Sequence, residues 1–254
     1  MISGATITSM VVSVLFPFLL FAGLILFFRK KTGISIRPLI IGSIGFIVFT
    51  QILEKALHLV ILTNFPNIQD YPWALGLYGG MAAGVFEEFG RFLLFIWLLK
   101  KFHDYKSGIS FGIGWGGIEA VVIMLMVGLQ SLIFAFMINA GTFETMLNGQ
   151  IPSDQLSTLK ESIISQGAAY YLLSCLERFF AVFLQIALSL FVLLAVVKKK
   201  FLYVIYAVLI HAAIDFPVAF YQTGHLSIWA VEAYIAVLGV LSIVFIKRVK
   251  KHFH

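Results

Sequence analysis

The amino-acid sequence predicts an all-α membrane protein, a polytopic bundle of about seven transmembrane helices. The chain of 254 residues is 61% hydrophobic and 12% charged, with a mean hydropathy of +1.00. Apolar runs of more than about 18 residues, the length that a membrane-crossing helix requires, recur along the whole chain. These runs lack the alternation of polar and apolar residues that marks barrel strands, and only helices and closed barrels satisfy their backbone in lipid.

Seven apolar segments define the predicted spans. They cover residues 4–28, 37–62, 73–99, 107–138, 168–197, 201–222 and 227–246. The one long hydrophilic connection, residues 141–167, contains SDQLSTLKESIIS, which we expect to form an amphipathic surface helix with Ser153 as its N-cap. Because no Pro- or Gly-rich linker and no internal repeat is evident in the sequence, residues 1–254 are expected to form a single integral membrane domain.

Basic residues fall on one side of the membrane if the seven spans alternate. These residues are Arg29, Lys30, Lys31, Arg37, Lys100, Lys101, Lys106, Lys198 to Lys200, Lys247, Arg248, Lys250 and Lys251. The opposite loops hold a single basic residue, Lys160. The positive-inside rule therefore predicts an external N-terminus and an internal C-terminus. The net charge of +6 belongs to these topology determinants, so we expect no nucleic-acid partner. The single cysteine, Cys175, excludes an internal disulfide.

Several ionisable side chains remain inside the predicted spans, where each costs a few kcal/mol. Four polar residues lie within about one turn of the midpoints of their helices, at a rise of about 1.5 Å per residue: Glu87, Glu119, Gln185 and His211. This common depth predicts a shared polar cavity. Simpler structural roles remain open for each. Structural pairs are favoured for Glu54 and His58, at the outer edge, and for Glu177 and Arg178, in the outer third of the membrane.

Helical spacing places Glu87, Glu88 and Arg91 on one face of the third span. A stripe of small residues runs along the same face, and a second stripe precedes Glu119 in the fourth span: Gly76, Gly80 and Gly84, then Gly108, Gly112 and Gly116. We expect these two stripes to bring the third and fourth spans together. His211 and Asp215 lie one turn apart, so that the carboxylate could orient the imidazole.

Three segments resemble the ordered motifs of PrsW-type intramembrane proteases, a group that includes CAAX prenyl proteases and bacteriocin-processing enzymes. EEFGR at 87–91, FGIGWGGIEA at 111–120 and HAAID at 211–215 are similar to EExxR, FxxxE and HxxxD. The chain resembles the YhfC family in particular, whose ER…A…H pattern here reads ERFFAVFLQIALS at 177–189. There are two departures from the family pattern. Trp115 stands in place of Phe, which is a conservative change, and Gln185 stands in place of His, which keeps a catalytically inactive relative open as an alternative.

The resemblance implies an endopeptidase that cleaves a membrane-embedded or membrane-anchored protein or peptide, in a bacterial cell membrane. Glu87 would be the general base, supported by Glu88 and Arg91. His211, oriented by Asp215, would stabilise the oxyanion, and Glu119 would be a second polar group on the water or the carbonyl.

A metal-independent, glutamic-type mechanism is favoured, with no cofactor, because glutamine is a poor zinc ligand and the sequence contains no HExxH. The alternative is a zinc site made of Glu119 and His211 with Gln185, Asp215 or Glu87. Two alternatives lie outside proteolysis: a small proton-coupled transporter, and a catalytically inactive membrane scaffold.

Overall fold

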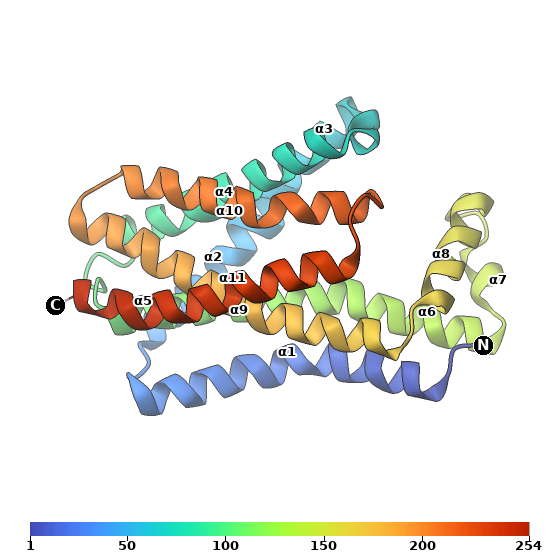
Figure 1. Ribbon diagram of the computed structural model, residues 1–254, viewed down its shortest axis with the longest axis horizontal. Coiled ribbons are helices and arrows are strands. Elements are labelled where there is room, and N and C mark those ends of the chain that lie inside the picture. The colour runs from blue at the N-terminus through green and yellow to red at the C-terminus, as the bar shows by residue number, and fades with distance from the viewer. Residues whose placement is uncertain (254) are drawn as a thin grey trace. The chain divides into compact units, whose positions relative to one another are not determined.

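The computed structural model describes residues 1–253, except for the side chain of Gln69, and divides them into two compact units. The first unit comprises Met1–Leu20 and Ala120–Phe179, and the second comprises residues 21–119 and 180–253. Helices account for nearly all of the regular structure, and no β-strand occurs among the described residues (Figure 1). The predicted all-α class is confirmed, whereas the single-domain organisation stays a prediction.

A helix or a set of consecutive helical segments occupies each predicted span. The bounds are α1 Gly4–Lys31; α2 Ile36–Phe46, η1 Ile47–Glu54 and α3 Lys55–Asn64; α4 Pro72–Trp97; α5 Tyr105–Ile123, η3 Met124–Gly128 and α6 Leu129–Ala140; α9 Ala168–Lys198; α10 Leu202–Gln222; and α11 Ile228–Val249. Within residues 1–253, six of these stretches are long and apolar enough to cross a membrane. The seventh, α4, has 26 residues, but its glycines and its charged residues lower its hydropathy.

Two of these stretches contain π-helical turns that the sequence did not predict. One is η1, which ends at Glu54, and the other is η3. A π-helical turn carries an extra residue and so rotates the side chains that follow it. Such turns are frequent at functional sites, and η1 ends at a buried glutamate.

The glycine stripe of α4 packs against α10 in the second unit. A Cβ added at Gly80 would lie 2.6 Å from the Ala212 carbonyl oxygen, and one added at Gly84 would lie 2.6 Å from that of Val208. The expectation that this stripe meets the fourth span was therefore wrong. The residues do serve close helix packing, but a periodic stripe of small residues does not specify which helix it will meet.

The glycine stripe of α5 packs against α9 instead. A Cβ at Gly112 would lie 2.7 Å from the Ile186 Cα, and one at Gly116 would lie 2.7 Å from the Gln185 Cβ. The opposite side of α5 meets α2, where Gly114 approaches the Leu39 carbonyl. Helix α5 is therefore held between two neighbours at backbone distance.

Helix α10 continues through Pro217, which lacks the N–H that would bond to the Ala213 carbonyl one turn earlier. The Tyr234 hydroxyl of α11 donates to this carbonyl at 2.9 Å. This bond satisfies the backbone acceptor that the proline leaves open, and it ties α11 to α10 close to Asp215.

The first unit contains the connection that was predicted to be external. In it, α7 (Phe143–Leu147) and α8 (Ser153–Ser165) follow Gly141, whose φ of +71° ends α6. The helix expected in this segment is present, but Ser153 is not its cap, because Pro152 occupies that position and Ser153 is the first helical residue. A hydrophobic cluster holds the unit together: Ile2, Met10, Ala135, Ile138, Phe143, Leu156, Ile163 and Tyr171.

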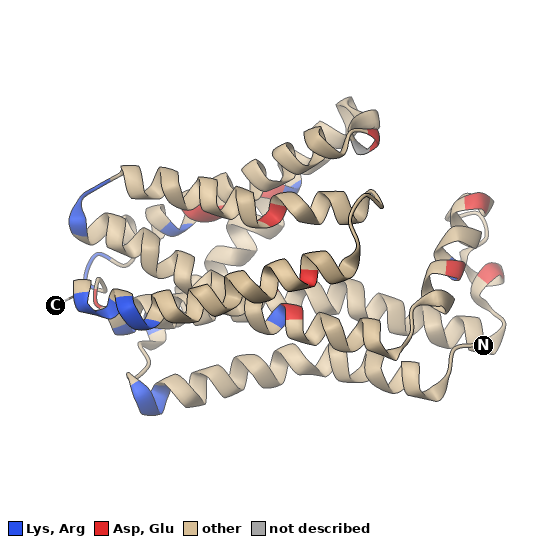
Figure 2. Cartoon of the chain, viewed as in Figure 1, with Lys and Arg blue, Asp and Glu red and all other residues tan. Residues whose placement is uncertain are grey.

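The charged residues of the second unit occupy two kinds of position (Figure 2). Most lysine and arginine residues gather at the ends of its helices, as the positive-inside pattern requires. Acidic residues lie within α4 and α10, far from the ends of those helices. The candidate site is built around this second group.

Candidate active site

The Arg91 side chain is fully buried at the centre of a polar cluster in the second unit. Its Nη2 donates to Glu87 Oε2 at 2.7 Å and to Gln185 Oε1, and its Nη1 donates to Glu88 Oε1. The i+3 and i+4 spacing of α4 places both carboxylates beside one guanidinium. Arg91 thus pairs with both glutamates and links α4 to α9.

The indole of Trp115, on α5, holds Glu87 from another side. Its Nε1 donates to Glu87 Oε2 at 2.8 Å, and its ring faces the Arg91 guanidinium carbon at 4.7 Å. A phenylalanine at this position would keep the aromatic face but lack the N–H donor. The departure from the family motif at Trp115, which looked conservative in the sequence, therefore adds a hydrogen bond to the candidate base.

His211 brings α10 into the cluster, and its two ring nitrogens face different carboxylates. Nδ1 lies 2.6 Å from Glu88 Oε1, where a carboxylate can only accept, so Nδ1 bears a proton. Nε2 lies 3.4 Å from Asp215 Oδ2 and 3.9 Å from Glu87 Oε1. Asp215 was expected to orient the imidazole, but Glu88 makes the shorter bond.

Five of the six residues predicted to form the site are joined by these contacts, namely Glu87, Glu88, Arg91, His211 and Asp215. Gln185 also belongs to the network, through Arg91. Glu119 lies on α5 one turn beyond Trp115 and is half-buried, and it is not among the residues that these bonds connect. Its role in the site stays a prediction.

Glu54 is a buried residue that the sequence interpretation did not place near the site. A structural pair at the outer edge was favoured for Glu54 and His58. The pair is present, with His58 Nε2 3.2 Å from Glu54 Oε1, and the Glu54 side chain is buried. The signal was present in the sequence as the spacing of Glu54 and His58. The depth of Glu54 depends on how η1 packs against α4, which spacing alone does not show.

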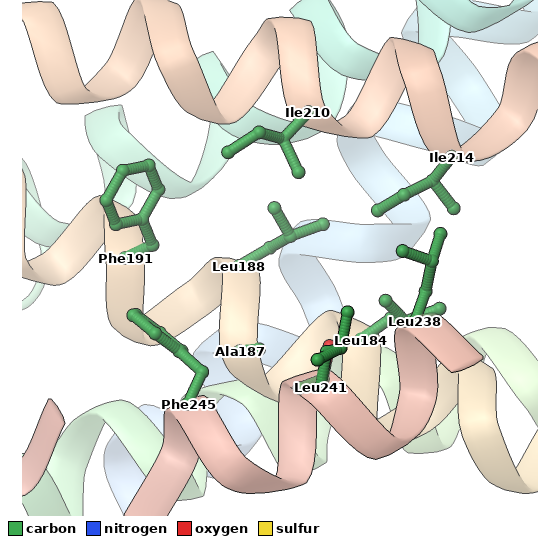
Figure 3. Close-up of a pocket in the computed structure, with 10 residues that line it drawn as sticks. Leu184, Ala187, Leu188, Phe191, Ile210, Ile214, Leu238, Leu241 and Phe245 are labelled. Carbon is green, nitrogen blue, oxygen red and sulfur yellow. The ribbon is translucent and has the colours of Figure 1, made fainter. Parts of the chain in front are cut away.

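An apolar cavity of about 240 Å³ lies beside the polar cluster, between α9, α10 and α11. Figure 3 shows Ile210 and Ile214 of α10 pointing into it, and these residues immediately precede His211 and Asp215 in sequence. The remaining lining is Leu184, Ala187, Leu188, Phe191, Leu238, Leu241, Ser242 and Phe245. Polar and apolar surfaces thus lie on adjacent faces of one helix.

The fold and the cluster define a polytopic integral membrane protein with charged residues buried among its helices. The family model described as "YhfC intramembrane metalloprotease" matches residues 13–236, and the chain belongs to this YhfC family. It is similar to the protein named "Uncharacterized membrane protein YhfC" of Bacillus subtilis (strain 168), with 35% identity over 258 aligned residues, covering 100% of both chains. No solved structure matches. The family assignment supports an intramembrane protease of a bacterial membrane.

The family description implies a bound metal ion. The distances between the side chains of the site show whether they could hold zinc. Tetrahedral zinc with bonds of about 2.0–2.2 Å holds its ligand atoms about 3.3–3.6 Å apart. The separation of His211 Nε2 and Asp215 Oδ2, 3.4 Å, matches this, but Glu87 Oε1 lies 3.9 Å from Nε2. Within residues 1–253, no three His, Cys, Asp or Glu side chains gather as a metal site. In their described positions these residues do not fit a three-ligand zinc site.

Proposed function

We propose that this protein is an intramembrane endopeptidase of the glutamic type, in which Glu87 activates water against a peptide bond of a membrane-embedded substrate. The observation that supports this most is that the two carboxylate oxygens of Glu87 have different contacts. Oε2 accepts from Arg91 and Trp115, whereas Oε1 makes no hydrogen bond within the described chain and faces His211 Nε2 at 3.9 Å. A held carboxylate with one free oxygen is suited to act as a general base.

In this mechanism, a water molecule would bind at Glu87 Oε1 and attack the carbonyl carbon while transferring a proton to that oxygen. The protonated Glu87 would return the proton to the amide nitrogen, the C–N bond would break, and a carboxylate and an amine would leave. His211, with Nδ1 held by Glu88, would turn an Nε2–H toward the developing oxyanion in place of Asp215. These steps need no reactant besides water and the peptide.

Arg91 and Trp115 would act as positioning residues in this scheme. A single carboxylate in hydrocarbon is costly, and the paired guanidinium offsets part of that cost. Two donors on Oε2 also fix the carboxylate plane, so that Oε1 points at the reacting water. The apolar cavity next to α10 would accommodate a hydrocarbon group of the substrate.

A zinc-dependent reaction is the second candidate. It is favoured by the family description and by the 3.4 Å separation of His211 Nε2 and Asp215 Oδ2. Purified protein treated with a zinc chelator separates the two candidates. Full activity after metal removal supports the glutamic type. Loss of activity that zinc restores would replace it with the metal-dependent reaction.

The proteolytic function is tested by reconstituting the purified protein in liposomes with membrane proteins extracted from a bacterial host. New N-termini would be labelled and identified by mass spectrometry. We expect cleavage sites inside or next to transmembrane segments with the wild type, and their absence with His211→Asn. No new N-termini with either protein, or the same set with both, would contradict the proposal.

A further inference from the structure

A second polar chain lies at the end of the second unit where α3 ends and α4 begins. His58 Nδ1 lies 2.5 Å from the Tyr78 hydroxyl, and its Nε2 lies 3.2 Å from Glu54 Oε1. The chain runs inward, because the His58 side chain is 33% exposed whereas the Glu54 side chain is 8% exposed. It therefore connects a partly open position to a buried carboxylate.

The packing of η1 against α4 leads this chain toward the candidate site. A Cβ at Gly90 would meet the Phe49 ring, and His58 contacts Tyr78, so the two segments run in opposite directions. Glu54 accordingly lies level with the turn of α4 that precedes Glu87.

Four buried polar atoms on these two segments have no hydrogen-bond partner within the described chain: Thr50 Oγ1, Glu54 Oε2, Glu88 Oε2 and Arg91 Nε. They occur on η1 and α4, at and around the level of Glu54 and Glu87. Buried polar groups that find no protein partner are generally satisfied by ordered water. Thr50 and Glu54 both lie in the π-helical segment η1, whose turns are wider than those of an α-helix.

We propose that Glu54, His58, Tyr78 and Thr50 line a path of bound water that leads from this end of the second unit to Glu87. Because the site lies within a bundle of membrane-spanning helices, any water that reaches it must follow polar groups. The evidence for the path is the placement of these side chains, so the proposal does not depend on whether the protein cleaves peptides.

The path is tested by cysteine accessibility in a Cys175→Ser background, in which the protein has no other cysteine. Single cysteines replace Thr50 and His58, both on the proposed path. Matched controls replace Leu59 and Leu77, which are 71% and 63% exposed on the apolar surface of the same two helical stretches. A charged, membrane-impermeant thiosulfonate is added outside sealed proteoliposomes sorted for the predicted orientation.

We expect Thr50→Cys and His58→Cys to react at least about tenfold faster than Leu59→Cys and Leu77→Cys, because only the hydrated thiolate is reactive. Labelling after unfolding in detergent gives the total thiol of each variant. A misfolded variant is recognised because its thiol reacts at the same rate in proteoliposomes as after unfolding. Thr50→Cys preserves the size of the side chain and is the variant expected to fold most reliably. Rates at Thr50 and His58 equal to those of the two leucine controls, in folded protein, would overturn the path.

Discussion

The two units of the chain each contain an ion pair, and the pairs differ in what surrounds them. In the second unit Arg91 and the carboxylates of Glu87 and Glu88 are at most 6% exposed. In the first unit Lys160 pairs with Glu144 while their side chains are 34% and 53% exposed. Solvent screens the Lys160–Glu144 pair and leaves it with little effect on stability. The buried Arg91 pairs are not screened in this way and depend on every partner that the fold supplies.

The charges of the exposed pair in the first unit are in contact with water, whereas those of the α4 cluster in the second unit are kept away from it. The α7–α8 pair can break and be hydrated at little cost, so it constrains nothing around it. The α4 cluster recruits a tryptophan, a glutamine and a histidine from three other helices, which together fix its geometry. A cluster of this kind is expected where chemistry needs oriented charge.

The largest effect is expected from Arg91→Met, which leaves two buried carboxylates without their cation. We expect a loss of about 3–5 kcal/mol in the free energy of unfolding, measured by unfolding in mixed micelles of dodecyl maltoside and sodium dodecyl sulfate. Arg91→Lys, which retains the charge without the bidentate geometry, should lose less. Stability equal to wild type for Arg91→Met would show that the cluster is not held by this residue.

The next effect concerns the backbone contact that brings His211 to α4. Gly80→Ala places a methyl group 2.6 Å from the Ala212 carbonyl oxygen, and we expect a loss of about 1–3 kcal/mol of stability together with reduced cleavage. The adjacent Gly79 is the matched control, because a Cβ there meets nothing within 4 Å. If both variants behave alike, the close approach of α4 and α10 does not position the imidazole.

Trp115→Phe should have a smaller effect that falls mainly on activity. It removes the N–H that donates to Glu87 Oε2, and one such bond to a charged group contributes about 1.5–3 kcal/mol, so kcat/KM should fall at least about tenfold. Trp97→Phe, at an exposed tryptophan, controls for the change of ring size. An unchanged kcat/KM for Trp115→Phe would leave Trp115 a packing residue only.

The smallest effect is expected from Lys160→Met in the exposed pair. The Lys160 ammonium, hydrogen-bonded to Glu144, holds the pKa of that carboxyl below its usual range. The pair thus contributes only above the ordinary pKa of glutamate and is lost as the pH falls through the lowered value. We expect the melting temperature at pH 7 to match wild type within error. A clear drop would mean that exposure is a poor guide to the importance of an ion pair in this protein.

The sequence predicted the helices well and the contacts between them less well. Apolar length determines where a helix crosses, so each of the seven predicted spans coincides with a helix or a set of consecutive helical segments. The 87–91 motif and the pair His211–Asp215 were placed in one cluster by their common depth. The partner of the Gly76–Gly84 stripe was not predictable, because any helix can accept a stripe of small residues.

The finer arrangement of the site depends on how each helix is rotated about its own axis. The spacing of residues in the sequence does not show this rotation. The expected pair of Glu54 and His58 is present, but the π-helical turns that end at Glu54 leave no signature in the sequence. Gln185 was seen as a departure that put the site in doubt, yet it accepts from Arg91. A substitution in a motif can thus serve the same network with different chemistry.

The central claim is that the charge of Glu87 serves hydrolysis and not only packing. It is tested most directly by Glu87→Gln, which keeps the size of the side chain and an oxygen acceptor for Trp115 and Arg91. Cleavage of an identified membrane substrate and the melting temperature would be measured on the same preparation. We predict that cleavage falls by a factor of about 10² to 10⁴, as for loss of a general base, while the protein remains folded. Cleavage at the wild-type rate by folded Glu87→Gln would contradict the account.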